Sequence, residues 1–272
     1  MSDQITIADA IKEMVRARYG SIAVGAASSC CDAAQDKNMD GKARRMGYSA
    51  AELAAVPEGA NLGLGCGNPQ AIAAMRPGEV VVDLGSGAGF DCLLAARQVG
   101  PNGRVIGVDM THEMLRAARE NARKIGAANV EFRLGELEHL PIADGTADVV
   151  LSNCVINLVP DKAQVFREAF RVLKPNGRLA ISDVINIKPL RPDLAADRAL
   201  ICGCVAGAAP STQIEAWLAA AGFVDIHVTV KQESREMIET WAPGRGIEDY
   251  VASANIEARK PRHDDEIKIC CA

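Results

Sequence analysis

Residues 81–91 read VVDLGSGAGFD and join an apolar, β-branched run to three glycines, at positions 85, 87 and 89. The segment CLLAARQVG that follows has the composition of a helix, so the stretch predicts a strand, a tight loop and a helix. Glycine lets the backbone turn with positive φ and come close to a ligand, and the helix start offers unpaired N–H groups. Phe90 stands where the dinucleotide pattern G-x-G-x-x-G has its third glycine, which favours a nucleoside other than NAD.

Strand-like and helix-like segments alternate after this loop. We expect strands at 79–84, 104–110, 130–135, 147–157 and 177–185, and helices at 90–99, 112–126 and 161–173. Strands separated by helices of this length form right-handed βαβ units and a parallel sheet. The sequence therefore predicts an α/β fold of the Rossmann-like type, with a mainly parallel, doubly wound sheet of at least five strands and helices on both faces.

The residues before this core have a different character. Residues 5–19 carry apolar side chains at a helical period, and residues 25–47, which are rich in small and polar side chains, predict a mobile loop that contains Cys30 and Cys31. Residues 48–56 predict a short helix in which Ser49 and Glu52 form a capping box. Cys66 follows in a glycine-rich turn. We group residues 1–70 as an N-terminal helical and loop segment that packs on the core at residues 71–188.

The pattern changes again after Pro189. A helical stretch at 190–208 carries Cys202 and Cys204, and alternating segments at 225–234 and 251–260 predict two more strands. We expect residues 189–262 to form a helical insert and a smaller C-terminal α+β module, followed by a polar tail at 263–272.

Composition narrows the range of functions. Hydrophobic residues make up 49% of the 272 residues, yet no apolar run reaches the roughly 20 residues that a membrane span needs. The N-terminal sequence lacks the features of a signal peptide, so we expect a cytoplasmic protein. A net charge of -5 without a basic run gives no electrostatic footprint for nucleic acid. A small-molecule partner is the expectation.

The chain has nine cysteines, which is a high number for a cytoplasmic protein of this size. In a reducing compartment a disulfide framework is not expected, so metal, metalloid or redox chemistry is the natural alternative. Structural zinc is disfavoured because no C-x-x-C pair occurs and there are only four histidines.

Acidic residues at strand ends indicate the nucleoside site. Asp83 ends the first strand and Asp109 ends the second, where a carboxylate can accept hydrogen bonds from both ribose hydroxyls. Glu136 follows the third strand, where it is either a cofactor contact or a solvated surface carboxylate. The full set of expected cofactor residues is Asp83, Gly85, Ser86, Gly87, Gly89, Asp109, Met110, Glu136, Leu137 and Asn153.

Three cysteines from separated segments have polar or glycine-rich neighbours. Cys66 lies between two glycines, Cys154 follows a strand expected to end beside the cofactor, and Cys204 lies in the insert. Their thiolates can converge over the cofactor. Buried cysteine often packs as a small hydrophobe, and we favour that interpretation for Cys92, which lies on the helix after the glycine loop.

The core resembles the class I S-adenosylmethionine-dependent methyltransferases over about residues 77–182, through DLGSGAG, Asp109 and KPNGRLAISD. A closer resemblance, over about residues 48–209, is to the arsenite methyltransferases. It is carried by YSAAELAAVPEGANLGLGCGNP, by LSNCVINLVPDKAQVFREAFRVLKPNGRLAISD and by ICGCVAGA. This resemblance implies that Cys66, Cys154 and Cys204 bind trivalent arsenic, with Cys154 and Cys204 engaged throughout. It also implies a further N-terminal cysteine as redox partner, either Cys30 or Cys31.

The resemblance implies a mechanism as well. Trivalent arsenic held by three sulfurs keeps a lone pair that can attack the sulfonium methyl group, so no general base is needed. Thioredoxin or glutathione would recharge the thiols after each transfer. Two alternatives remain: a quinone- or sterol-type methyltransferase, which shares the whole core, and a non-catalytic sensor that binds arsenicals on the same scaffold.

Overall fold

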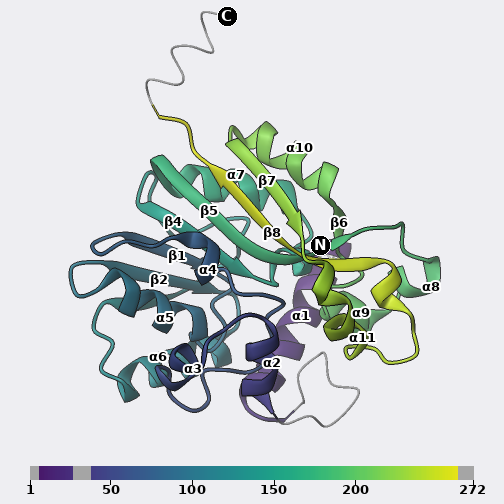
Figure 1. Cartoon of the computed structure of the whole chain (residues 1–272), viewed down its shortest axis with the longest axis horizontal. Helices are drawn as coiled ribbons and strands as arrows, with labels where there is room; N and C mark the ends of the chain where they lie inside the picture. The colour runs from purple at the N-terminus through teal and green to yellow at the C-terminus, as the bar shows by residue number, and fades with distance from the viewer. Residues whose placement is uncertain (1–5, 27–37, 263–272) are drawn as a thin grey trace, which may run out of the picture.

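The computed structural model describes residues 6–26 and 38–262 and organises them around one mixed sheet (Figure 1). In the described residues the sheet has eight strands in the order β3-β2-β1-β4-β5-β8-β7, with β6 paired to β5. Strands β1 to β5 are parallel, and β8 is antiparallel to both of its neighbours. The strands are β1 (Val80–Leu84), β2 (Arg104–Asp109), β3 (Val130–Leu134), β4 (Ala147–Asn153), β5 (Leu173–Asn186), β6 (Ala209–Pro210), β7 (Val224–Val230) and β8 (Val251–Arg259).

Helices cover both faces of this sheet. Helices α5 and α6 contact β1, β2 and β3, whereas α7 and α10 pack on one another and on β5 and β7 (Figure 1). The helices are α1 (Ile7–Ala23), α2 (Met39–Arg45), α3 (Ala50–Ala54), α4 (Gln70–Ala73), α5 (Phe90–Val99), α6 (His112–Lys124), α7 (Lys162–Val172), α8 (Pro192–Ala195), α9 (Arg198–Cys202), α10 (Ser211–Ala221) and α11 (Arg235–Glu239), with 3-10 turns η1 (Ile156–Leu158), η2 (Gln232–Ser234) and η3 (Ile247–Asp249). No helix in the described ranges is long and apolar enough to cross a membrane.

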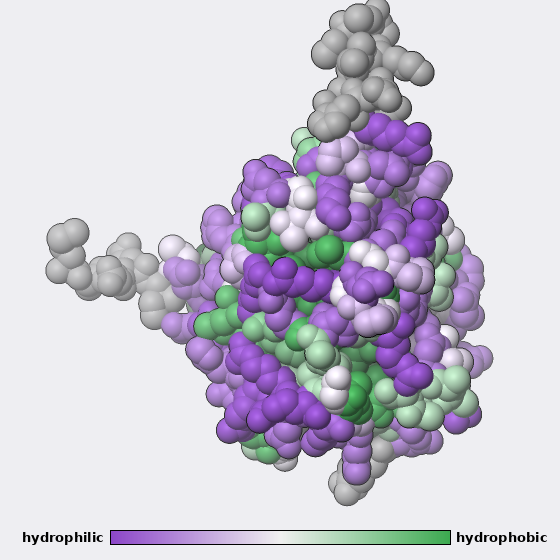
Figure 2. All heavy atoms as spheres, turned by 90° about the vertical axis from the view of Figure 1, so that its left-hand side faces the viewer, coloured by the Kyte–Doolittle hydropathy of each residue, from purple (hydrophilic) through white to green (hydrophobic). Residues whose placement is uncertain are grey.

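Alternation along the strands divides the core into two layers. Val81 and Val149 face α5 and α6, and their neighbours Val82 and Val150 face α7 and α10. Successive strand residues point to opposite faces, so two buried faces require the nearly continuous apolar runs that the sequence shows. The face turned to the viewer in Figure 2 is largely hydrophilic, with hydrophobic side chains visible in short bands between polar ones.

The predicted core is confirmed. The structure has the strand, glycine loop and helix at residues 80–99, the expected βαβ alternation and helices on both faces. The capping box of α3 is also present: the Ser49 hydroxyl accepts from the backbone N–H of Glu52, and the Glu52 carboxylate accepts from the backbone N–H of Ser49.

Two local predictions are wrong. Part of the expected loop at 25–47 is helix α2, because the Asn38 side chain caps its first turn and Ala43 packs beside Tyr48. The expected helical stretch at 190–208 is broken into α8 and α9, since Asp197 caps the start of a new helix and that helix ends at Cys202, before Gly203. The loop around Cys30 and Cys31 and the tail with Cys270 and Cys271 lie outside the described residues.

The C-terminal strands extend the core sheet. β8 pairs with β5 along its whole length, and β7 pairs with β8 on the outer side. Within the parallel part of the sheet, the strand order reverses between β1 and β4: β2 and β3 lie on one side of β1, and β4 and β5 lie on the other. Such a reversal leaves a crevice at the carboxyl ends of the two strands. The loops after β1, β2 and β4 all reach this crevice.

Candidate active site

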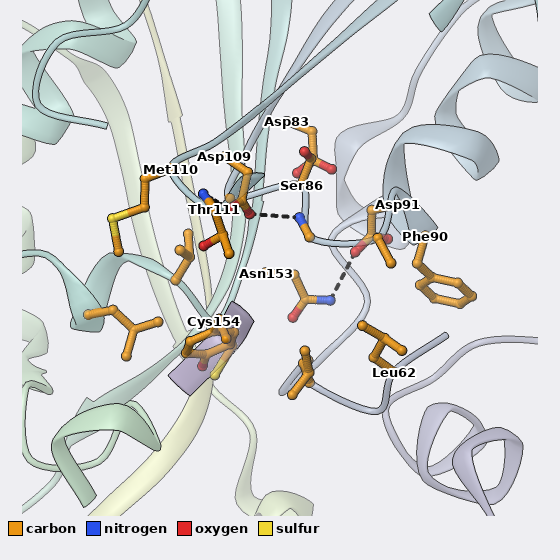
Figure 3. A pocket seen from close by; sticks show the side chains of 18 of the residues that line it. Leu62, Asp83, Ser86, Phe90, Asp91, Asp109, Met110, Thr111, Asn153 and Cys154 are labelled. Carbon is orange, nitrogen blue, oxygen red and sulfur yellow. Dashed lines mark hydrogen bonds between the residues drawn. The ribbon is translucent and has the colours of Figure 1, made fainter. Parts of the chain in front are cut away.

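A cavity of about 140 Å³ lies in this crevice, at the carboxyl ends of β1, β2 and β4 (Figure 3). Its wall contains Gly85, Ser86, Gly87 and Ala88 of the loop that joins β1 to α5. Gly85 has φ +71°, and a Cβ atom there would lie 2.5 Å from the Val155 side chain, so only glycine fits. The loop is therefore shaped to bring backbone against whatever fills the cavity.

Ser86 supplies an unsatisfied polar group to this wall. Its hydroxyl oxygen is buried and has no hydrogen-bond partner among the described residues. Buried polar groups are nearly always hydrogen-bonded, so this hydroxyl indicates a ligand that carries polar atoms. The observation fits S-adenosylmethionine, whose ribose and amino acid groups offer such partners.

Asp109 ends β2 beside the loop. Its carboxylate accepts hydrogen bonds from the backbone N–H groups of Gly87, at 2.9 Å, and Thr111, at 2.8 Å. Burial raises the pKa of Asp109, and the bonds from the backbone oppose that shift. The carboxylate is thus fixed at the cavity wall, next to Met110, where the sequence predicted a ribose contact.

Some expected cofactor residues lie elsewhere. Leu137 lines the cavity, but Glu136 pairs with Lys12, at 2.7 Å, and with Arg16, at 3.3 Å, and is not among the lining residues. Gly89 precedes α5 and is also not among them. The cofactor role of Glu136 and Gly89 stays a prediction.

A hydrogen-bond network in the cavity wall joins the cofactor side to the thiols. Tyr48 donates to Asp91 at 2.7 Å, and the Asn153 amide donates to Asp91 at 3.1 Å, as Figure 3 shows for the latter. The Asn153 oxygen accepts from the backbone N–H of Cys66 at 3.1 Å. Asn153 therefore contacts both halves of the site.

Two carboxyl groups share this network's low-dielectric surroundings. Burial, and then the nearby Asp91, raise the pKa of Asp83 well above its usual range. Burial also raises the pKa of Asp91, although hydrogen bonds from Tyr48, Gln70 and Asn153 oppose it. Both acids line the cavity. Perturbed titratable groups in a cleft are typical of functional sites.

The three predicted cysteines converge at one end of the cavity. Cys154 lines it directly, and the Cys204 thiol donates to the Cys154 carbonyl at 2.8 Å. The Cys66 thiol donates to the carbonyl of Ser182 at 3.5 Å, and the backbone N–H of Cys154 donates to the same carbonyl at 2.8 Å. Cys204, 50 residues after Cys154, thus contacts the backbone of Cys154 directly, and Cys66, 88 residues before it, shares the Ser182 carbonyl with that backbone.

Two of these cysteines have an unusual backbone. Cys154 has φ +57° and Cys204 has φ +63°, both in the left-handed region. Non-glycine residues seldom adopt this region, and such strain gathers at functional sites. Cys204 consequently lies in the turn after α9 and not on a helix, whereas Cys202 is the last residue of α9.

The surroundings of Cys154 favour its neutral thiol form. Hydrogen bonds with Cys204 and Cys66, together with burial, raise the pKa of Cys154 well above its ordinary value. Burial likewise raises the pKa of Cys92, whose thiol donates to Asp83 at 3.1 Å. Cys92 is fully buried among the apolar side chains that face α5 and α6, as expected for a packing cysteine.

Sequence reasoning missed several residues of this site. Tyr48 and Asp91 were given no role, although Asp91 closes the stretch quoted first. Asp183 was also missed, although it follows an apolar strand segment in the same way as Asp83 and Asp109 do. For Asp183, the sequence feature that could have identified it is an acidic residue next to an apolar strand segment. Lys12, which reaches the cavity from α1, left no signal in the sequence.

Comparisons with known proteins agree with this geometry. Residues 75–234 match the family described as "Methyltransferase domain". The arsenite methyltransferase of Halobacterium salinarum is 52% identical over 264 residues, which are 93% of this chain and 68% of that protein. The human arsenite methyltransferase is 42% identical over 137 residues, which are 47% of this chain and 36% of that protein.

A solved structure extends the comparison to three dimensions. The arsenic (III) S-adenosylmethionine methyltransferase of Chlamydomonas reinhardtii superposes with a TM-score of 0.61 at 33% identity, over 81% of this chain and 73% of that one. The chain spans less than half the length of the human protein and about two thirds of the Halobacterium protein, so it corresponds to part of each.

Proposed function

This chain belongs to the arsenite methyltransferases, a family of S-adenosylmethionine-dependent methyltransferases, and from that membership we propose that it methylates trivalent arsenic held by its own cysteine thiolates. The observation that carries the proposal is the convergence of thiols at the cofactor cavity: the Cys204 sulfur lies 2.8 Å from the Cys154 carbonyl oxygen, and Cys154 lines the cavity. The product serves arsenic biotransformation and detoxification.

The methyl donor is held by residues of the glycine loop and the neighbouring strand ends. Asp109 would accept hydrogen bonds from the ribose hydroxyls, the Ser86 hydroxyl would gain the partner that it lacks within the described chain, and Met110 and Leu137 would contact the adenine. When bound, S-adenosylmethionine supplies an electrophilic methyl group on a sulfonium. Asp83 and Asp91 line the same wall and would lie near the bound donor.

The acceptor atom is held by Cys66, Cys154 and Cys204. Trivalent arsenic is soft and prefers sulfur, and with three sulfur ligands it keeps a lone pair that serves as the nucleophile. No base is required to generate that lone pair. The chain's work is to hold the arsenic beside the cavity, and such positioning can lower a barrier by about 7–11 kcal/mol.

Binding need not change the proton balance near neutral pH. Arsenous acid carries three hydroxyl groups, and each can leave as water with the proton of the thiol that replaces it. The raised pKa of Cys154 supports this exchange, because the thiol retains its proton until arsenic arrives.

Methyl transfer leaves pentavalent arsenic, which must be reduced before the next turnover. We assign this step to thiols recharged by thioredoxin or glutathione, with Cys30 or Cys31 as the redox partner. Thiol–disulfide exchange needs an accessible thiol and a reducing compartment, so we place the reaction in the cytoplasm.

Labelled S-adenosylmethionine tests the proposal. We expect the full chain, incubated with the labelled donor, arsenite and a thiol reductant, to release labelled methyl arsenicals. In a parallel incubation that also contains a quinone acceptor, label recovered in the quinone and not in arsenic would support the quinone-type methyltransferase. Arsenite binding without any label transfer would support a sensor.

A further inference from the structure

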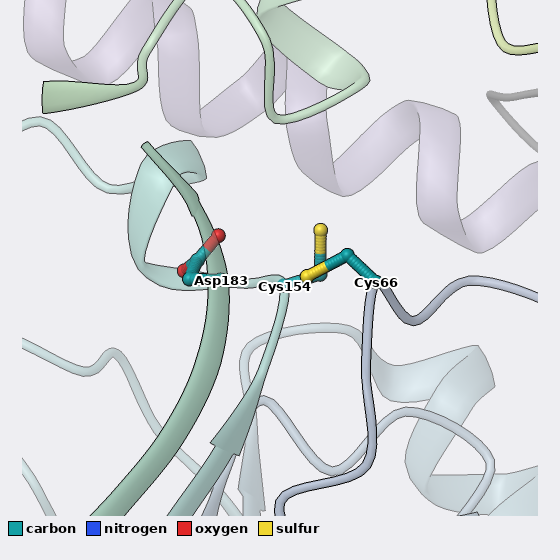
Figure 4. A group of neighbouring side chains, drawn as sticks. All are labelled: Cys66, Cys154 and Asp183. Atoms are coloured by element: carbon teal, nitrogen blue, oxygen red, sulfur yellow. The ribbon is translucent and has the colours of Figure 1, made fainter. Parts of the chain in front are cut away.

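A carboxylate lies with two of the arsenic-binding sulfurs. The Cys66 sulfur, the Cys154 sulfur and a carboxylate oxygen of Asp183 all lie within 4.8 Å of one another, and all three residues are buried. Figure 4 shows the Cys66 side chain extending toward Cys154, with Asp183 on the other side. The mechanism above gives Asp183 no task.

Neighbouring donors hold this carboxylate in place. One oxygen accepts from the Asn157 amide at 2.9 Å and the Val184 backbone N–H at 2.7 Å, and the other accepts from the Ile156 backbone N–H at 3.0 Å. A carboxylate has about four acceptor positions, so the second oxygen keeps one. An outer shell that orients a carboxylate in this way is typical of metal-ligating residues.

The donor set suits a different ion from arsenic. Trivalent arsenic is satisfied by three sulfurs, whereas zinc-like cations take thiolates and carboxylates together in tetrahedral sites. With metal–sulfur bonds near 2.3 Å and metal–oxygen bonds near 2.1 Å, tetrahedral donors lie about 3.5–3.8 Å apart. Because no two of the three donors are more than 4.8 Å apart, each pair would need to approach by about 1.0–1.3 Å at most to reach that spacing.

Two partly buried lysines can compensate the charge of such a site. Lys231 lies beside the turn of Cys66, since a Cβ atom on Gly67 would be 2.7 Å from its amine. Lys162 is partly buried and interacts electrostatically with Asp183. Two thiolates, one carboxylate and a divalent cation leave one negative charge, which these ammonium groups can balance.

We propose that Cys66, Cys154 and Asp183 bind a thiophilic divalent cation, of the Zn²⁺ or Cd²⁺ class, and that this cation competes with trivalent arsenic for the two shared sulfurs. Two metal–sulfur bonds and one metal–oxygen bond form, and the two thiol protons pass to solvent. The competition rests on the proposed function, whereas the cation site itself does not. Asp183 serves the cation alone, and Cys204 serves arsenic alone.

Cadmium binding to the full chain tests this assignment through its thiolate charge-transfer absorbance, under a reductant that is not a thiol. The vicinal pairs Cys30–Cys31 and Cys270–Cys271 would bind cadmium by themselves, so all four residues are first replaced by serine. In this background we expect one tightly bound cadmium per chain that arsenite displaces.

Two variants in that background give opposite results. Asp183→Asn should weaken cadmium binding at least tenfold and change arsenite affinity less than twofold. Cys204→Ser should abolish three-sulfur arsenite binding and leave cadmium affinity within threefold. Cadmium binding that Asp183→Asn leaves unchanged would overturn the proposal, as would equal losses for both ions, which would indicate a structural role.

A spectroscopic measurement covers the case in which Asp183→Asn does not fold. X-ray absorption at the zinc edge of the loaded background protein should show two sulfur ligands completed by oxygen ligands. A shell made only of sulfur would overturn the proposal. Failure of the proposed function would look different, because methyl transfer would then be missing without any added cation while cadmium binding followed the pattern above.

Discussion

At the scale of single residues, Asn153 and its partners link the two halves of the reaction. The Asn153 amide donates to Asp91 and to the Tyr48 hydroxyl, while its oxygen holds the backbone N–H of Cys66. One side chain therefore positions both a carboxylate of the cavity wall and the backbone of Cys66, a proposed arsenic ligand. None of this follows from sequence spacing, because Tyr48, Asp91 and Asn153 meet only after the chain has folded.

Tyr48→Phe tests the weight of this network. The hydroxyl that donates to Asp91 at 2.7 Å is lost, and the shortfall in donors to a buried carboxylate should cost about 1–3 kcal/mol of folding free energy at pH 7.5. The folded-state pKa of Asp91 lies above its unfolded value, so its protonated form is favoured in the folded chain at low pH and this stability is lost as the pH rises through the folded pKa. The loss from Tyr48→Phe should therefore be larger at pH 7.5 than at pH 4.5.

Urea unfolding at the two pH values measures this difference. Tyr250→Phe is the control, because Tyr250 lies outside this network, and it should change stability by less than about 0.5 kcal/mol. An equal loss for Tyr48→Phe at both pH values would show that the hydroxyl does not act through the Asp91 carboxylate.

At the scale of elements, helix α1 spans the donor and acceptor sides. Lys12 pairs with Glu136, at 2.7 Å, and Glu138, at 3.0 Å, after β3, and the Tyr19 hydroxyl donates to the Cys202 carbonyl at the end of α9. Val15 of the same helix packs in one apolar cluster with all three cysteines that we propose as arsenic ligands. The helical period of the apolar residues predicted α1, but it did not predict the surface on which the helix packs, because an apolar stripe does not identify its partner.

Lys12→Met should loosen this helix. Its loss leaves Glu138, whose side chain is 8% exposed, without its cation, which should cost about 1–3 kcal/mol. We expect faster amide hydrogen exchange in α1 and about tenfold weaker binding of S-adenosylhomocysteine. Lys124→Met, which removes an exposed i,i+4 pair, should change neither by a measurable amount. Unchanged amide hydrogen exchange in α1 of the Lys12 variant would show that the ion pairs of Lys12 do not hold this helix in place.

At the scale of the whole molecule, the sequence predicted most of the donor half and less of the acceptor half. Asp109 and the glycine loop are local patterns: a strand end and a tight turn need particular residue types wherever they occur. Cys66 and Cys204 approach Cys154 only through tertiary packing, so the sequence suggested that the three thiols could converge, and their arsenic-binding role came from a family resemblance. Asp183 shows most clearly what the sequence cannot predict. It resembles Asp83 and Asp109 in its sequence surroundings, but its hydrogen-bond partners lie on η1 and β5.

The sheet also shows why the C-terminal segment is difficult to separate in sequence. Residues 189–262 were grouped as a smaller module, yet β8 pairs with β5 over nine residue pairs, from Arg178 to Asn186. Hydrophobic alternation predicts a strand but not which sheet it joins. Stability should consequently be shared between the core and these strands.

Ile256→Ala tests this sharing. Ile256 is 2% exposed in β8 and packs in the cluster that faces α7 and α10. Its truncation should cost about 2–5 kcal/mol and lower the midpoint of a single unfolding transition, seen equally by circular dichroism and by loss of cofactor binding. Ile187→Ala, at a side chain 47% exposed, is the control and should change little. Two separate transitions would mean that the C-terminal strands unfold on their own.

The central claim is that the chain transfers a methyl group to arsenic held by Cys154 and Cys204, and a single-turnover assay with labelled S-adenosylmethionine and arsenite tests it most directly. Cys154→Ser and Cys204→Ser should abolish labelled methyl arsenicals while binding of S-adenosylmethionine persists. Cys202→Ser, a buried cysteine two residues from Cys204, should retain transfer. Undiminished transfer in either of the first two variants would contradict the account.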